Sequence, residues 1–179
     1  MRKITVLAAT VAALTGATAA SAQTASASPY VGVTAGYHDL DTSGVITGAG
    51  VSDDGAIFGV VGGVDVPVSQ NLSVGVEGNY NVGTGRVDQE YGVAARVSFP
   101  FSEGSSGYIR GGYQWVDIDI SDLNVIQVTP GVDTTRGDYL VGAGAEFGTS
   151  MFGGAKLRVG VDTIGFDTVR ATAGVIVKF

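Results

Sequence analysis

The sequence predicts an all-β protein, an eight-stranded antiparallel up-and-down transmembrane β-barrel. Three observations predict this fold class. Eight short segments alternate apolar and polar residues, the full charges within these segments fall on the polar face, and the connections between segments sort into short and long ones. No segment repeats its apolar residues with the period of about 3.6 that an amphipathic helix requires.

The first 22 residues have the layout of a secretory signal peptide. Arg2 and Lys3 precede a short apolar run, and the small residues Ala-Ser-Ala end at Ala22 as a cleavage pattern. The apolar run is well under the roughly 20 residues that a spanning helix needs. We therefore predict a removed signal peptide at 1–22, a short N-terminal segment at 23–28 and the β-barrel at 29–179.

Composition limits the function classes. Removing 22 of the 179 residues leaves about 157, enough for one domain. The chain has no cysteine, which excludes disulfides, thiol catalysis and cysteine metal sites. Losing Arg2 and Lys3 reduces ten basic residues to eight against seventeen acidic ones, so the formal charge changes from −7 to −9. This acidity argues against a nucleic-acid partner.

Alternation defines each predicted strand. In Asn71–Val82, Leu72 and Val74 share one face, while Ser73 and Glu77 lie on the other. The alternation is least regular in the second segment, where several valines interrupt it. The eight predicted strands are Tyr30–His38, Ala56–Val66, Asn71–Val82, Glu90–Pro100, Tyr108–Val116, Tyr139–Phe147, Ala155–Thr163 and Val169–Phe179.

The connections alternate in length. PVSQN, PFSEGS and GTSMFG are tight turns, whereas His38–Gly55 and Asp117–Gly137 are long and acidic, and Gly83–Asp88 and Gly165–Asp167 are shorter links. If the first strand starts at the periplasm, the tight turns share one rim and the other connections share the opposite rim. Short periplasmic turns and longer extracellular loops are typical of an outer-membrane barrel of a Gram-negative bacterium. We expect the two long loops to be mobile and protease-sensitive on intact cells.

The charges on the polar face indicate which face of each strand points into the barrel. The opposite face carries no full charge, so we expect it to meet lipid. An eight-stranded barrel is just wide enough inside for side chains to fill, and unpaired charges there are costly, so the sequence predicts a plugged lumen closed by salt bridges in a monomer. The predicted lumen charge network consists of Asp65, Glu77, Glu90, Arg96, Arg110, Glu146, Lys156, Arg158, Asp162, Arg170 and Lys178.

Aromatic residues of the apolar face lie near strand ends, where girdles meet lipid headgroups. We predict such girdles from Tyr37, Tyr80, Tyr91, Phe99, Tyr113, Trp115, Tyr139, Phe147 and Phe179.

Four blocks of the chain resemble a known superfamily: NLSVGVEGNY, EYGVAARVSF, the glycine-rich YIRGGYQW and the terminal ATAGVIVKF. The chain is similar to the small eight-stranded outer-membrane barrels, which include the outer membrane protein A-type transmembrane domain, opacity-type surface antigens and porin-family barrels. The last block resembles their assembly signal, here Val175, Val177 and Phe179. The resemblance implies that the barrel-assembly machinery handles the chain, and it brings no catalytic or ligand motif.

Candidate catalytic and metal residues are few. His38 is the only histidine, and some enzymes of the superfamily that modify lipid A use a histidine near that rim. No motif fixes the geometry of its sequence neighbours, so we interpret His38 as a loop histidine facing water. The acidic run DIDISD lacks the glycine and the terminal Glu of a calcium loop. We expect no enzyme, metal site or cofactor; the rejected candidates are Ser43, Ser52, Asp53, Asp54, Asp117, Asp119 and Asp122.

Three functional classes remain open. We favour a structural and surface-interaction barrel that acts through acidic extracellular loops on a ligand that the sequence does not identify. A narrow small-solute channel would instead show conductance in planar bilayers, and a lipid A-modifying enzyme would remove an acyl chain. The expected partners are outer-membrane lipid and the assembly machinery. A soluble lipocalin-like barrel is the architectural alternative.

Overall fold

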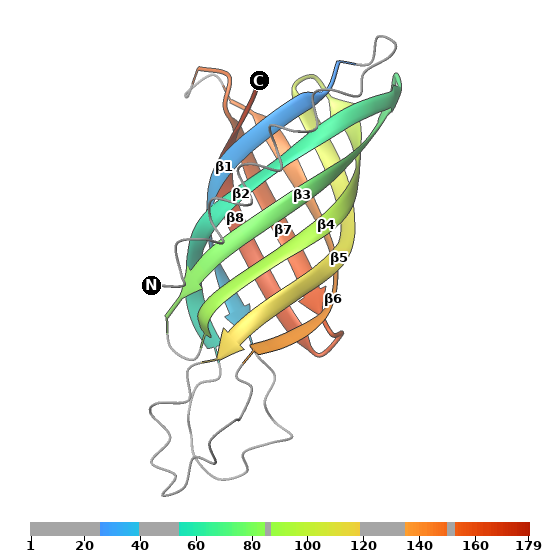
Figure 1. Ribbon diagram of the computed structural model, residues 1–179. Helices are drawn as coiled ribbons and strands as arrows, with labels where there is room; N and C mark the ends of the chain where they lie inside the picture. The colour runs from blue at the N-terminus through green and yellow to red at the C-terminus, as the bar shows by residue number, and fades with distance from the viewer. Residues whose placement is uncertain (1–25, 40–53, 85–86, 119–134, 150–152) are drawn as a thin grey trace, which may run out of the picture.

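The computed structural model describes residues 26–39, 54–84, 87–118, 135–149 and 153–179. The predicted signal peptide lies outside these ranges, as do the middle parts of the two long loops. The eight strands are β1 (Ser28–Asp39), β2 (Asp54–Ser69), β3 (Leu72–Gly83), β4 (Val87–Ser102), β5 (Ser105–Ile118), β6 (Thr135–Gly148), β7 (Lys156–Ile164) and β8 (Thr168–Lys178), as Figure 1 shows.

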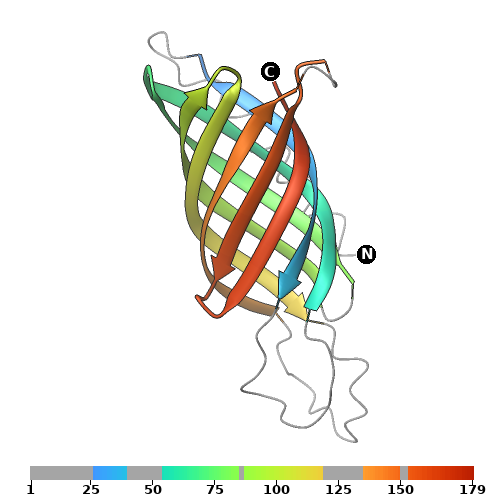
Figure 2. The ribbon, with the colours of Figure 1, turned by 180° about the vertical axis from the view of Figure 1, so that it is seen from behind.

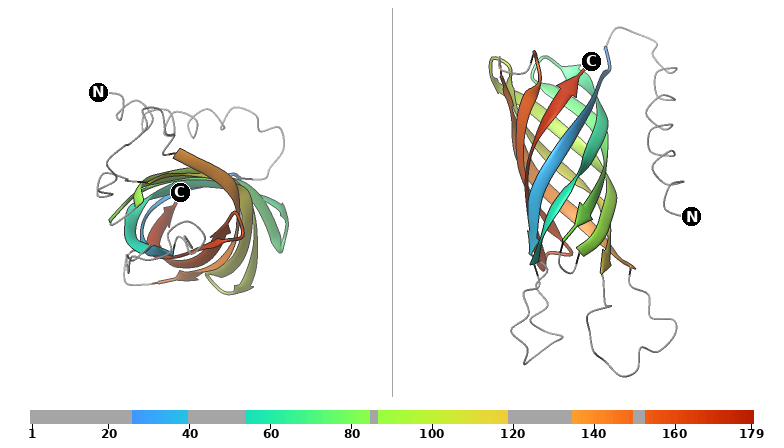
Figure 3. Two further views of the ribbon diagram at one scale, coloured as in Figure 1. Left: turned by 90° about the horizontal axis from the view of Figure 1, so that it is seen from below. Right: turned by 90° about the vertical axis from the view of Figure 1, so that its left-hand side faces the viewer.

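The strands form one closed antiparallel barrel in sequence order. β1 pairs with β2 on one side and with β8 on the other, from Tyr30↔Lys178 to Asp39↔Val169. The Phe179 amide donates to the Pro29 carbonyl over 2.9 Å, which extends the closing seam. Figures 2 and 3 show the same closed wall from behind and along its axis. Closure leaves no strand edge unpaired, and the predicted fold class is confirmed.

The barrel has two different ends. At the turn end, uppermost in Figure 1, lie both ends of the strand order and the β2–β3, β4–β5 and β6–β7 connections. At the loop end lie the strand ends that flank the other four connections, such as Asp39 of β1 and Asp54 of β2. The predicted sorting of connections onto two rims is therefore confirmed by the strand order.

Several strands extend beyond their predicted ends. β2 runs to Ser69 and β4 to Ser102, and the ladder shifts register just after Pro67 and Pro100. Proline cannot donate to the ladder, and a bulge lets the strand continue past it. β6 begins at Thr135 because its backbone pairs with β5 even where its polar residues show no alternation.

The outer face of the wall is apolar. Val33 exposes 62% of its surface, and most of the large apolar side chains on the outward positions are similarly exposed. A soluble protein would bury such a continuous apolar surface, whereas lipid solvates it. Within the described ranges no helix is long and apolar enough to cross a membrane.

Candidate functional site: the ion-paired lumen

The inner face gathers the charged side chains of the strands. Lys156 and Lys178 lie near the turn end and are partly exposed. The buried members of the predicted set are Asp65, Glu77, Glu90, Arg96, Arg110, Glu146, Arg158, Asp162 and Arg170. Strand alternation thus places all eleven predicted charges on one face, and the barrel curvature brings them within reach of one another.

Glu77 lies at the centre of the lumen. Its carboxylate accepts hydrogen bonds from Arg158 Nη2 at 2.5 Å, from Arg96 Nη1 at 3.2 Å and from Arg110 Nη1. The Tyr30 hydroxyl adds a fourth donor at 2.5 Å. One buried carboxylate therefore holds three guanidiniums from three different strands, which ties β3 to β4, β5 and β7. Such charge-assisted hydrogen bonds are stronger than neutral ones.

A second group of pairs lies toward the turn end. Arg96 Nη2 donates to Glu146 over 2.8 Å, and its Nε lies 3.3 Å from Asp65. Lys178 Nζ lies 3.2 Å from Asp65 and 3.0 Å from Glu146. Lys156 forms no ion pair with any residue of the described ranges. The structure thus brings Lys178 into the network and leaves Lys156 beside it.

A third group lies toward the loop end. Arg170 donates from Nη1 to Glu90 over 2.5 Å and from Nη2 to Asp162 over 3.0 Å. Arg110 joins this group because its Nε and Nη2 donate to the two oxygens of Asp162 at 2.8 and 2.6 Å. Asn81 donates to Glu90 over 2.8 Å. The network is continuous along the barrel axis through Arg96 and Arg110.

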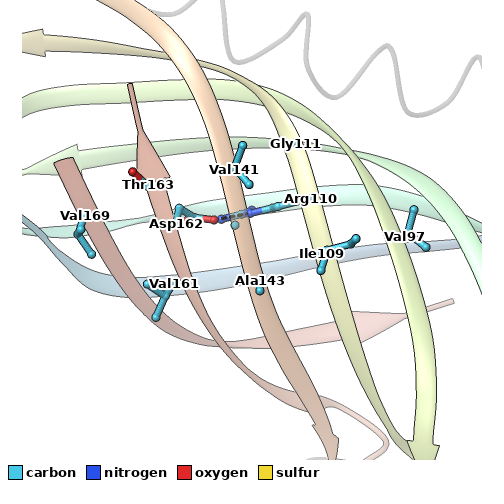
Figure 4. Close-up of a pocket in the computed structure, with 11 residues that line it drawn as sticks. Val97, Ile109, Arg110, Gly111, Val141, Ala143, Val161, Asp162, Thr163 and Val169 are labelled. Carbon is cyan, nitrogen blue, oxygen red and sulfur yellow. Dashed lines mark hydrogen bonds and ion pairs between the residues drawn. The ribbon is translucent and has the colours of Figure 1, made fainter. Parts of the chain in front are cut away.

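Glycines on the inner face make this packing possible. Gly142 stands between Arg110 and Asp162 in the register of β5, β6 and β7, and Figure 4 shows the guanidinium reaching the carboxylate across β6. A Cβ on Gly142 would collide with the Asp162 carboxylate. Likewise, a Cβ on Gly63 would lie 2.5 Å from the Tyr30 hydroxyl. Each glycine leaves the space that a long or aromatic side chain from a neighbouring strand occupies.

Two tyrosines line the central arginines. The Arg96 and Arg158 guanidiniums each lie 4.6 Å from the centre of the Tyr108 ring, and 5.1 and 5.4 Å from that of Tyr30. Cation–π attraction is strongest where water is excluded. Neither tyrosine was predicted from the sequence as a lumen residue, although Tyr30 lies on the same face of β1 as Thr34 and His38.

Apolar side chains are also buried inside the barrel toward the loop end. Ile57, Val87 and Val116 pack together inside the barrel and are almost fully buried. Ala94, Leu140 and Ile164 form a second buried cluster. The polar interior predicted from the sequence does not include these apolar clusters, whose residues lie on the inward face, most of them near the ends of their strands. We name Ile57, Val87 and Val116 the inner cap.

The interpretation of His38 as a loop histidine facing water is wrong. His38 lies in β1 and is fully buried, because its parity turns it into the lumen. Its Nδ1 lies 2.7 Å from Glu90, and its Nε2 lies 3.5 Å from the Thr168 hydroxyl. An acid, an imidazole and a hydroxyl thus stand in sequence, but Thr168 donates its proton to the Ile164 carbonyl. The Thr168 hydroxyl is only partly buried, and its proton is directed to a backbone carbonyl and not to His38.

The other rejected candidates gain nothing from the structure. Ser43, Ser52, Asp53, Asp119 and Asp122 lie outside the described residues, and Asp54 is described only as a backbone position in β2. Asp117 accepts a hydrogen bond from Gln89. Within the described ranges, no group of three histidine, cysteine or acidic residues could hold a metal ion.

The outer wall carries aromatic groups near the loop end. Trp115 stacks on Tyr91 at 5.5 Å between ring centres and lies 4.9 Å from Tyr113. Tyr139 meets Tyr113 edge-on at 5.7 Å. These rings belong to the predicted girdle and come from β4, β5 and β6.

A shallow apolar hollow of about 640 Å³ lies in the same outer wall, over β4 to β8. Gly111 and Ala143 leave its floor low, and Ile109, Val141 and Val161 bound it (Figure 4). Lipid chains suffice to fill a hollow of this kind in a lipid-facing wall, so it carries no further site.

Comparisons with known proteins agree with this architecture. A family model described as the outer membrane protein beta-barrel domain matches residues 8–176. No protein matches in a search of curated sequences.

Solved structures share the fold at low sequence identity. Neisserial surface protein A is 14% identical with a TM-score of 0.53, and the N-terminal barrel of OprF from Pseudomonas aeruginosa is 12% identical with a TM-score of 0.52. Each comparison covers 88% of this chain and 100% of the other. A de novo designed transmembrane barrel is 17% identical with a TM-score of 0.50, over 88% of this chain and 98% of that one. The chain belongs to the outer membrane protein β-barrel family of the bacterial outer membrane.

Proposed function

We propose that this chain is a sealed barrel whose role lies at the cell surface, where it presents its loop-end segments to a partner. The observation that carries the proposal is the filling of the lumen. Nine charged side chains are buried in mutual ion pairs, and the inner cap lies beside them toward the loop end. A water-filled channel would instead leave its lining charges exposed.

The surroundings of His38 do not favour an enzyme. The imidazole lies between Glu90 and the Thr168 hydroxyl, and that hydroxyl donates its proton to the Ile164 carbonyl. One fold can host many unrelated functions, so function has to be argued from sites. The sites that remain are the acidic loop-end segments, and a partner that binds there should carry basic groups.

Conductance tests this proposal directly. Purified protein in planar bilayers should give no steady current, because the paired charges and the inner cap leave no continuous water path. Loosening the lumen with Glu146→Ala should introduce current fluctuations. A steady wild-type conductance, together with an unchanged urea midpoint in Glu146→Ala, would establish the small-solute channel instead.

We also propose that Val175, Val177 and Phe179 act as the assembly signal. Val177 and Phe179 are exposed on the outer side of β8, next to the β1 seam. Phe179→Ala should lower the amount of barrel in the outer membrane without changing the stability of protein refolded in detergent. Phe101→Ala is the matched control, because Phe101 is also an exposed aromatic residue at the turn end. Equal losses in both variants would contradict a specific signal.

A further inference from the structure

The turn between β7 and β8 holds an aromatic residue in an unfavourable backbone conformation. Gly165 and Phe166 each have a φ of 65°. Consecutive positive φ values are typical of tight hairpin turns, where glycine and asparagine are preferred because a larger side chain crowds its own backbone. Phe166 is the only residue other than glycine with a positive φ in the described ranges. The geometry of the turn therefore does not explain a phenylalanine at this position.

Packing does not explain Phe166 either. The residue exposes 75% of its surface, the largest fraction among the large apolar residues of the described chain. It lies at the loop end, in the short connection between the last two strands (Figure 2). Strained residues persist mainly where function requires them. Since neither the turn nor the core accounts for Phe166, we infer that its ring contacts another molecule.

Two carboxylates lie beside this turn. A Cβ on Gly165 would lie 2.8 Å from an oxygen of Asp138 and 2.8 Å from an oxygen of Asp167. Arg136 lies 3.6 Å from Asp167. Asp138 accepts a hydrogen bond from the Tyr139 amide over 2.8 Å but forms no ion pair within the described ranges. The turn thus presents an exposed ring next to one carboxylate that no cation compensates.

The carboxylates argue against lipid as the molecule that covers Phe166. Asp167 follows Phe166 directly in a connection of three residues, so a ring that entered the bilayer would draw this carboxylate toward the hydrocarbon. Desolvating a charge costs more free energy than burying a ring gains. A protein surface meets both needs, because an apolar pocket receives the ring and a basic side chain pairs with Asp138.

We propose that the β7–β8 turn is a contact point for the surface partner, with Phe166 as the anchor. The partner is a protein or peptide whose apolar pocket is bordered by lysine or arginine. This inference rests on the proposed role at the cell surface but not on the sealed lumen. Steady conductance would therefore refute the sealed barrel and leave the contact at this turn to be tested separately.

A stability measurement tests whether Phe166 has a structural role. Phe166→Gly should raise the thermal midpoint in detergent by about 2–4 °C, because glycine adopts a positive φ without strain. Phe101→Gly is the matched control. Phe101 is also exposed but lies within β4 without a positive φ, so this change should lower the midpoint. A lower midpoint in Phe166→Gly would make the ring structural and overturn the proposal.

Paramagnetic agents test which medium surrounds the turn. In lipid nanodiscs, a water-soluble gadolinium chelate should broaden the NMR signal of the Phe166 amide. A nitroxide attached to the lipid chains should leave this signal sharp. The opposite pattern would place Phe166 in the bilayer and overturn the proposal.

A random peptide library displayed on phage is the probe for the chemistry of the partner. Selection on the wild-type barrel in nanodiscs, with counter-selection on Phe166→Gly, should enrich peptides that combine apolar residues with lysine or arginine. Asp138→Asn should weaken the binding of these peptides about tenfold, the effect of losing one charge pair. Glu103→Gln, in the β4–β5 turn, is the matched control and should bind them as the wild type does.

Three results of the selection would each overturn the proposal. The first is an absence of peptides whose binding depends on Phe166. The second is enrichment of peptides that lack basic residues. The third is binding that Asp138→Asn leaves unchanged.

Discussion

Val76 and Glu77 are neighbours in β3, yet Val76 exposes 54% of its surface on the outer wall and Glu77 exposes 3% inside the barrel. The two side chains are solvated by different media, because lipid surrounds the first and guanidiniums surround the second. Each outer residue meets a fluid that adapts to its shape, whereas each inner residue depends on fixed partners. The fixed contacts of the inner face therefore specify this barrel, whereas its outer face only has to remain apolar.

The largest expected effect is on the inner side of this comparison. Glu77→Ala leaves three buried guanidiniums without their shared carboxylate, and the unfolding free energy should fall by about 3–5 kcal/mol. Urea unfolding of protein refolded in detergent micelles measures the change. Glu103→Ala removes an exposed carboxylate from the β4–β5 turn and is the matched control. If the two variants lose equal stability, the lumen is water-filled and the comparison fails.

Charge on the outer side should have the next largest effect. Val76→Arg places a guanidinium against lipid, and the unfolding free energy in liposomes should fall by about 2–4 kcal/mol if the site is near the bilayer midplane. Val76→Leu keeps the face apolar and should change stability little. An unchanged unfolding free energy in Val76→Arg would mean that lipid does not cover the wall around Val76.

The inner cap allows the same comparison between two neighbouring apolar residues. Ile57 is buried in the cap, while Phe58 beside it in β2 exposes 54% of its surface. Ile57→Ala should cost about 2 kcal/mol, because it opens a cavity among fixed neighbours. Phe58→Ala removes more atoms but should cost less, since lipid replaces them. Urea midpoints in lipid vesicles measure which of the two variants loses more stability. A larger loss in Phe58→Ala than in Ile57→Ala would refute a packed inner cap.

The smallest effect is expected for an ion pair at the rim. Arg136 and Asp167 lie 3.6 Å apart, and their side chains are 70% and 50% exposed. Water screens such a pair, so Arg136→Ala should lower the unfolding free energy by no more than about 0–1 kcal/mol. The same urea titration applies, repeated at high salt, where the difference from wild type should vanish. A loss as large as that of Glu77→Ala would mean that the rim is as tightly packed as the lumen.

Much of the fold follows from local pattern. Alternation along β3 and β8 assigns each residue to a face, and the full charges of the predicted strands identify the inner one. The same parity rule would have placed Tyr30 and His38 inside, but the position of His38 at the end of a strand favoured the interpretation as a loop histidine. The extension of β2 past Pro67 and of β4 past Pro100 could not be predicted. It depends on a bulge in each strand and on how the partner strand continues the ladder.

By itself, the sequence determined the number of strands, their order around the barrel and the face that each charge occupies, because strand geometry repeats every two residues whatever the surroundings. Which lumen residues pair with one another depends on the tertiary structure. The stagger of the closed ladder sets Glu77 among Arg96, Arg110 and Arg158, and it sets His38 against Glu90, which is 52 residues away in the sequence. Local pattern does not encode that stagger, since it arises only when β1 and β8 join.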